Sequence, residues 1–96
     1  MDNGVTEINE RVTVVAIYER RSETARLCYP AKMRYRDQEV TFTEFGLWHP
    51  TKQGKRAIHV FDMSDGVCDY RLEFDAEALT WRLISILDLS GGRHGE

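Results

Sequence analysis

The stretch that most constrains the fold is residues 48–86, where three runs of alternating residues are separated by two turn signals. In the clearest run, residues 67–75, apolar side chains occupy positions 68, 70, 72 and 74. A period of two places alternate side chains on opposite faces of a β-strand, so one face is buried and the other is solvated. The turn signals are Ser64-Asp65-Gly66 and Asp75-Ala76-Glu77. Together they predict an antiparallel β-meander.

The segments upstream of this meander also have the pattern of strands. Residues 11–20 are apolar on both faces, and residues 31–36 alternate between apolar and basic side chains. Asp37-Gln38 is a candidate two-residue turn leading to a strand over 39–48. The inward set of that strand changes phase near Thr43-Glu44, which is typical of a β-bulge.

Proline and glycine punctuate the second half of the chain. We expect residues 49–54 to form a loop, because Pro50 cannot continue a central strand and Gly54 tolerates positive φ. Residues 55–63 are apolar on both faces, which predicts a central strand. A last strand is expected over 80–87, where Trp81 is predicted to lie in the core.

The length of 96 residues favours one domain with one core. We predict an all-β fold of five or six antiparallel strands, curled into an open barrel or half-barrel. In this scheme residues 1–10 are a flexible arm, residues 11–88 are the β domain and residues 89–96 are a disordered tail.

Composition argues against several classes of function. The net charge of −3 excludes a globally basic nucleic-acid binder, although residues 11–59 hold ten Lys and Arg against five Asp and Glu. The longest apolar run, 14–18, is far too short for a membrane span, and no signal peptide is visible. The two cysteines are expected to be free thiols. These features predict a cytoplasmic protein with no membrane partner.

Chemistry-bearing residues are few. The three histidines lack the spacing of a metal site, so no metal or cofactor is predicted. His59 and Cys68 are predicted to face each other across a strand pair, which is the beginning of a nucleophilic site but lacks a third group. Asp62 to Gly66 has acidic residues before a glycine, as calcium loops do, but the spacing fits a hairpin turn. No catalytic residue is therefore assigned.

The candidate binding surface is basic and aromatic. Small β-barrels bind single-stranded nucleic acid by stacking bases on aromatic side chains beside a positive groove. Basic side chains also protect edge strands from aggregation, which is the alternative interpretation. Trp48 is interpreted first as a core residue and otherwise as an exposed anchor for a partner. The residues of this surface are Lys32, Arg34, Arg36, Trp48, His49, Lys55 and Arg56.

Much of the chain, from Tyr29-Pro30 to Leu83, resembles small all-β bacterial domains of unknown function. The resemblance is carried by Val60-Phe61, Asp65-Gly66, the run 70–75 and the run 79–83. It implies a small antiparallel barrel or curled sheet and transfers no site residue. Our first functional hypothesis is a non-enzymatic binding module for a protein partner or for a second copy through an edge strand or Trp48. Single-stranded nucleic acid is the second, and a small enzyme built on His59 and Cys68 is the third.

Overall fold

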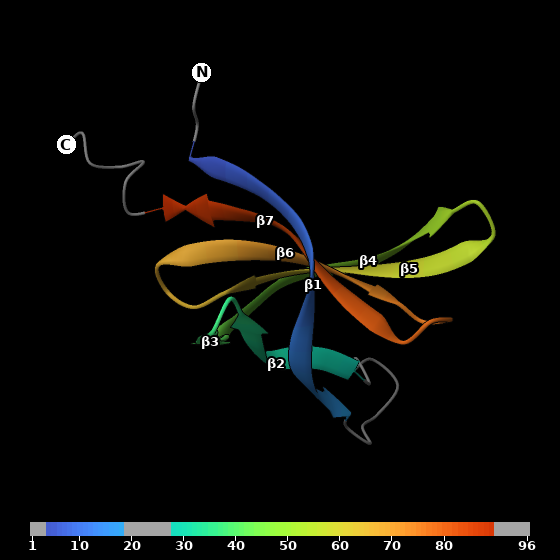
Figure 1. Ribbon diagram of the computed structural model, residues 1–96, viewed down its shortest axis with the longest axis horizontal. Coiled ribbons are helices and arrows are strands. Elements are labelled where there is room, and N and C mark those ends of the chain that lie inside the picture. Colours follow the sequence, from blue (N-terminus) through green and yellow to red (C-terminus); the bar gives the residue numbers. More distant parts are fainter. Residues whose placement is uncertain (1–3, 19–27, 90–96) are drawn as a thin grey trace.

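The computed structural model describes residues 4–18 and 28–89 and is built from antiparallel strands (Figure 1). The strands form one sheet in the order β3-β2-β1-β7-β6-β5-β4. This confirms the predicted all-β class, but seven strands replace the expected five or six. The strands are β1 (Val5–Tyr18), β2 (Cys28–Tyr35), β3 (Gln38–Thr41), β4 (Glu44–Gln53), β5 (Arg56–Ser64), β6 (Cys68–Asp75) and β7 (Thr80–Asp88).

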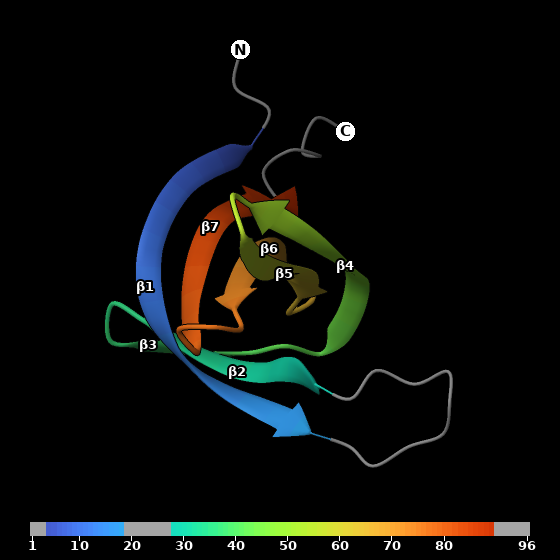
Figure 2. The ribbon, with the colours of Figure 1, turned by 90° about the vertical axis from the view of Figure 1, so that its right-hand side faces the viewer.

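The link between β3 and β4 forces the sheet to coil. These strands are the two edges of the sheet, yet only Phe42 and Thr43 separate them. In a flat sheet the edges would lie about 29 Å apart, whereas three Cα steps reach at most about 11 Å. Figure 2 shows the resulting arc, with β4 and β2 on opposite sides of its opening. The sheet is curled but not closed into a barrel, which agrees with the predicted half-barrel.

This link also accounts for the extra strand. The amide of Phe42 donates to Ala31 on one edge, and the amide of Thr43 donates to Ser64 next to the other. The segment predicted as a single strand over 39–48 therefore changes sheet edge at this point. The phase change near Thr43-Glu44, which predicts a bulge there, instead marks this crossing from β3 to β4.

Strand β1 holds the two halves of the sheet together. It pairs with β7 from Val5 to Val12 and with β2 from Thr13 to Tyr18. Residues 5–10, which were expected to belong to the arm, are therefore strand residues paired with β7. Residues 1–3, 19–27 and 90–96, which include most of the predicted tail, lie outside the described residues.

The core lies inside the curl and draws on both halves of the sheet. Met33 of β2, Leu72 of β6 and Leu83 of β7 are the most deeply buried members. Trp81 is 8% exposed, which confirms its predicted core position. The rest of the buried cluster is Phe42, Phe61, Met63 and Tyr70.

Strand β5 pairs with β4 on one side and β6 on the other and is buried on both faces, as predicted for a central strand. Phe61 faces the main core, and Ile58 and Val60 are each 5% exposed on the other face. The side chain of Gln53 donates to Glu73 at 3.5 Å across this second face. This hydrogen bond joins β4 to β6 across β5.

Two turns differ from expectation. The β2–β3 turn is Arg36-Asp37, with φ of 50° and 65°, one residue before the predicted Asp37-Gln38. Two positive φ values are typical of a type I′ turn. Residues 49–53, predicted as a loop, continue β4 through Pro50, which an edge strand tolerates. The turn there is Gly54-Lys55, with φ of 67° at Gly54.

A bulge does occur in β4, at Gly46 between Phe45 and Leu47. A Cβ atom at Gly46 would lie 2.8 Å from the backbone oxygen of Asp62 on β5. Only glycine allows the two backbones to approach this closely. The bulge adds to the bend that brings the two edges of the sheet together.

Candidate interaction surface

The predicted basic residues separate into two groups. Lys32 and Arg34 lie on β2, and Lys55 and Arg56 lie at the tip of the β4–β5 hairpin. Strands β1, β7 and β6 separate β2 from this hairpin in the sheet. Figure 1 shows the β2–β3 turn and the hairpin tip at opposite ends of the molecule. The sequence therefore named two surfaces rather than one.

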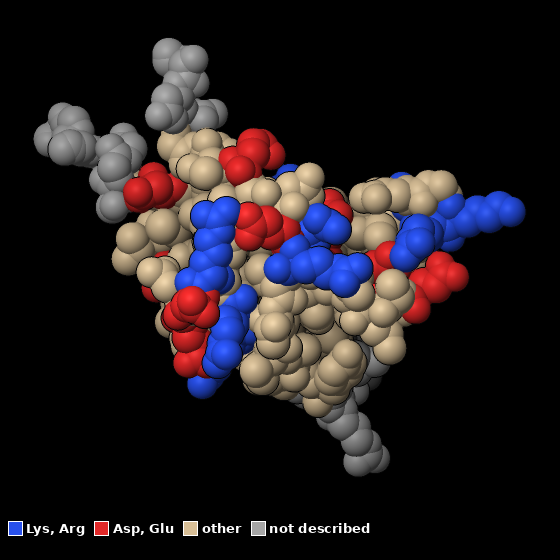
Figure 3. Space-filling model, viewed as in Figure 1, with Lys and Arg blue, Asp and Glu red and all other residues tan. Residues whose placement is uncertain are grey.

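The group on β2 is partly neutralised. Arg36 pairs with Glu10 of β1, a contact that raises the pKa of the guanidinium, and the same group lies 5.0 Å from the ring centre of Tyr35. Lys32 and Arg34 form no ion pair with a described residue, but Glu39 is the direct cross-strand partner of Arg34. Figure 3 shows Lys and Arg side by side with Asp and Glu over this region. The outer face of β2 is thus of mixed charge, without a continuous positive track.

Arg56 has a structural role in the second group. Its Nε atom donates to Asp75 at 2.8 Å, and this hydrogen bond raises the pKa of the guanidinium. Asp75 also accepts hydrogen bonds from the amides of Glu77 and Ala78, so the pair anchors the β6–β7 turn to the β4–β5 hairpin. His49 and Lys55 are exposed.

Trp48 is on the surface rather than in the core, with 41% of its area exposed. Its ring stacks on His59 at 6.0 Å between centroids, and its Nε1 donates to His59 Nδ1 at 3.3 Å. His59 in turn contacts Phe74, which packs against Trp81 of the core. Trp48 is therefore the exposed end of a chain of aromatic contacts that begins in the core.

The geometry removes the predicted couple of His59 and Cys68. His59 pairs with Phe74 near the end of β6, whereas Cys68 begins that strand and pairs with Asp88 of β7. Burial raises the pKa of the Cys68 thiol, and the nearby carboxylates of Asp88 and Asp65 raise it further. A thiol of this kind is a poor nucleophile. Both cysteines are free, as predicted.

The Asp65 segment is a structural turn. One carboxylate oxygen of Asp65 accepts the amides of Val67 and Cys68, each at 2.9 Å, and the other accepts the hydroxyl of Tyr70 at 2.9 Å. Gly66 has φ of 96°, which favours glycine. Burial tends to raise the pKa of Asp65, but these hydrogen bonds outweigh it and lower the pKa overall. The hairpin interpretation of this segment is confirmed.

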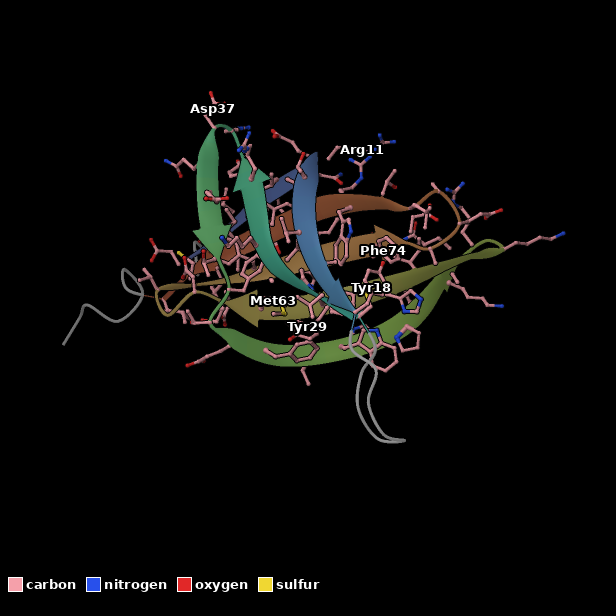
Figure 4. All side chains as sticks on the ribbon, turned by 90° about the horizontal axis from the view of Figure 1, so that it is seen from below. Arg11, Tyr18, Tyr29, Asp37, Met63 and Phe74 are labelled. Carbon is pink, nitrogen blue, oxygen red and sulfur yellow. The ribbon has the colours of Figure 1, made fainter. Side chains whose placement is uncertain are left out.

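A different surface, not predicted from the sequence, lies on the second half of β1. We call residues Thr13–Tyr18 the β1 edge segment. Here Val15 is 56% exposed, Ile17 is 37% exposed and Tyr18 is 69% exposed. Figure 3 shows an uncharged area over this end of β1, and Figure 4 shows Tyr18 and Tyr29 on the side where β4 passes. The only signal for this surface in the sequence was the two-sided apolar pattern of the first strand.

The β1 edge segment is also an open sheet edge. Strand β7 stops pairing with β1 at Val12, and no described residue pairs with the segment on that side. Tyr35 and Gln38 close a two-residue turn and so form a hydrogen-bonded pair. The β1–β2 register shifts between Val15 and Ala16, but the extra residue is Ala31 of β2, so β1 keeps its own alternation. Because hydrogen-bonded pairs alternate along antiparallel strands, the amides of Val14, Ala16 and Tyr18 are then on the open side.

The other two edges of the sheet carry devices that hinder strand pairing. Strand β3 is only four residues long and carries Glu39. Strand β4 is longer, but it contains Pro50, which has no amide N–H. Gln53 and Arg56 close the β4–β5 turn, so the same alternation places Pro50 at a position whose nitrogen points away from β5. The outer side of β4 therefore lacks one donor. Only the β1 edge segment, among the described edges, has neither a charge nor a proline.

Within residues 4–18 and 28–89, no group of three or more His, Cys, Asp or Glu is arranged to hold a metal ion. The same ranges contain no helix long and apolar enough to cross a membrane. No family model, no curated protein and no solved structure matches the chain.

Proposed function

We propose that this protein is a non-enzymatic interaction module that binds an extended segment of polypeptide by adding it as a strand beside β1. The observation that carries the proposal is the contrast between the sheet edges. A six-residue segment without charge or proline is open, whereas β3 and β4 are blunted. Proteins hinder pairing at edges that must stay single, so an edge without such protection is a candidate for use.

The side chains of the β1 edge segment suit this role. Backbone hydrogen bonds from Val14, Ala16 and Tyr18 would supply affinity, since these groups face the open side. Val15 and Ile17 would supply specificity, because alternate side chains of an added strand lie against them. The expected ligand is an extended segment rich in β-branched or aromatic residues.

The location proposed for the protein is the cytoplasm. Two free cysteines in 96 residues are usual for a protein kept in a reducing compartment. A bacterial source remains part of this proposal, on the resemblance described above.

The test is selection of a displayed random-peptide library on three immobilised proteins: wild type, Val15→Lys and Val67→Lys. Val67 is 52% exposed, close to the 56% of Val15, but lies at the β5–β6 turn, so it is a matched control. Peptides should be enriched on wild type and Val67→Lys and lost on Val15→Lys. Enrichment that Val15→Lys leaves unchanged, or no enrichment and no self-association, would overturn the proposal. A dispersed amide NMR spectrum checks that each variant is folded.

Single-stranded nucleic acid is the second candidate, favoured by Lys32 and Arg34, which are exposed and form no ion pair with a described residue. An amide NMR titration with a mixed oligonucleotide pool at low salt tests it. We expect the amides of Lys32 and Arg34 to stay unshifted. Shifts there that fade as salt is raised would support phosphate binding instead.

A further inference from the structure

We infer that the strand added beside β1 is the β1 edge segment of a second copy of this chain, so that the protein forms a two-fold symmetric dimer. This inference rests on the proposed function and names its partner. An antiparallel edge is complementary to itself, because each strand presents the donors and acceptors that its copy requires. A dimer of this kind needs one register that pairs the backbone amides on the open side of β1 and also lets the exposed side chains pack together.

One register does. With Ala16 opposite Ala16 of the copy, Val14 lies opposite Tyr18 of the copy, and the reverse pair follows by symmetry. All three residues whose amides face the open side are then paired. A register shifted by two residues toward the N-terminus would place Tyr18 opposite Val12 of the copy, which already pairs with β7.

The side chains fit the same register. Val15 lies opposite Ile17 of the copy on the outer face, so exposed apolar side chains cover each other. Ala16, the smallest residue of the segment, lies on the symmetry axis. The chain carries a net charge of −3, but the segment itself is uncharged, so no like charges meet within it. The other edges would bring Glu39 near its copy or lack a donor at Pro50.

The size of the contact sets its strength. Six strand residues extend only about 20 Å, so one added strand buries less area than the roughly 800 Å² per partner of a standard stable interface. We therefore expect a weak dimer that forms as concentration rises. Sedimentation equilibrium from about 10 μM to about 1 mM covers the range of weak association.

Two measurements test the dimer. In sedimentation, wild type and Val67→Lys should shift toward twice the monomer mass of 11.2 kDa, and Val15→Lys should stay monomeric. In mild oxidation with oxidised glutathione, an equal mixture of Val15→Cys and Ile17→Cys chains should form the mixed disulfide between positions 15 and 17 in preference to either symmetric one. Residues directly opposite at such a position are about 4.5 Å apart between Cα atoms, within disulfide range. Mass spectrometry of the cleaved peptides identifies the bonded positions.

The outcomes distinguish the dimer from the proposed function of strand addition, on which it rests. A wild-type monomer at about 1 mM that still enriches peptides in a Val15-dependent way would overturn the second copy and keep strand addition. A dimer that Val15→Lys leaves intact would show that the β1 edge segment is not the interface. Symmetric disulfides formed in equal yield to the mixed one would overturn the proposed register. A monomer that enriches no peptide would overturn both.

Discussion

At the scale of single residues, the carboxylate of Asp65 makes a contact with the core that the turn itself does not require. Any Ser-Asp-Gly sequence could make the hairpin, but here Asp65 also accepts the hydroxyl of Tyr70, whose side chain is 7% exposed. Burial and the hydrogen bond to Asp65 raise the pKa of Tyr70, so its hydroxyl stays protonated and remains a donor. The turn and the edge of the core are thereby joined by one side chain.

Replacing this carboxylate should lower the stability of the protein and make that stability less dependent on pH in the acid range. Because hydrogen bonds to a charged acceptor are stronger than those to a neutral one, Asp65→Asn should lower the free energy of unfolding at pH 7 by about 1 kcal/mol. The pKa of Asp65 is lower in the folded protein than its ordinary value of 3.8, so its contribution is present above pH 3.8 and is lost as pH falls through the folded value. Wild type should therefore lose more stability than Asp65→Asn on acidification below about pH 4.

Urea denaturation at a series of pH values measures both effects. Asp69→Asn is the control, because Asp69 lies on β6, four residues after Asp65, and its side chain makes no hydrogen bond or ion pair with a described residue. Equal acid sensitivity in wild type and Asp65→Asn would mean that the carboxylate is not the group that titrates.

At the scale of elements, the structure explains which strands could be predicted and which could not. Strands β5, β6 and β7 were expected within two residues of their bounds because their turns and alternation agree. The β3–β4 division was missed, since an apolar pattern that changes phase looks the same whether a strand bulges or crosses to another edge. The loop predicted at Pro50 is wrong for a related reason. Proline is excluded only from central strands, and the sequence does not state which strands are edges.

The candidate surface was harder to predict than the fold. Lys32, Arg34 and Trp48 are exposed, as a binding surface requires, but the basic residues divide between two ends of the sheet. The open side of β1 depends on where β7 stops pairing, which is a property of register between the first and last strands. Alternation within one strand carries no information about such register.

The role of Pro50 at the β4 edge can be tested directly. Pro50→Val should restore an outward amide donor to a ten-residue edge strand that already exposes Leu47 and Trp48. We expect increased self-association that does not depend on Val15. Thr51→Val, which changes the neighbouring residue on the other face, should have no such effect. Sedimentation velocity of both variants, each combined with Val15→Lys, measures this, and unchanged monomers would show that β4 is protected by something else.

At the scale of the whole molecule, the sheet should unfold as one unit although it consists of two meanders. Met33 comes from the β1–β2–β3 half, and Leu72 and Leu83 come from the other, yet all three are members of one buried cluster. Met33→Ala should therefore lower the stability of the entire domain, by about 2–5 kcal/mol for a fully buried methionine.

Coincident transitions would verify this cooperativity. Fluorescence is dominated by Trp48 and Trp81, which lie in the β4–β7 half, while far-UV circular dichroism reports all strands. Both should give the same urea midpoint in wild type and in Met33→Ala. Leu79→Ala is a surface control, since Leu79 is 71% exposed. Two separated midpoints would indicate that each meander unfolds independently.

The pairing of β1 with β7 also governs how the protein is made. Val5 pairs with Leu87, so the first half of β1 has no neighbour until β7 has been synthesised. At synthesis rates of about 5–20 residues per second, that delay is on the order of ten seconds. During it, Val5–Val12 lacks its partner strand and is available to nascent chains on adjacent ribosomes, whereas Thr13–Tyr18 can already pair with β2. Wrong pairing of a newly made chain should therefore concentrate on the first half of β1 rather than on the β1 edge segment, and it should end when β7 has been synthesised.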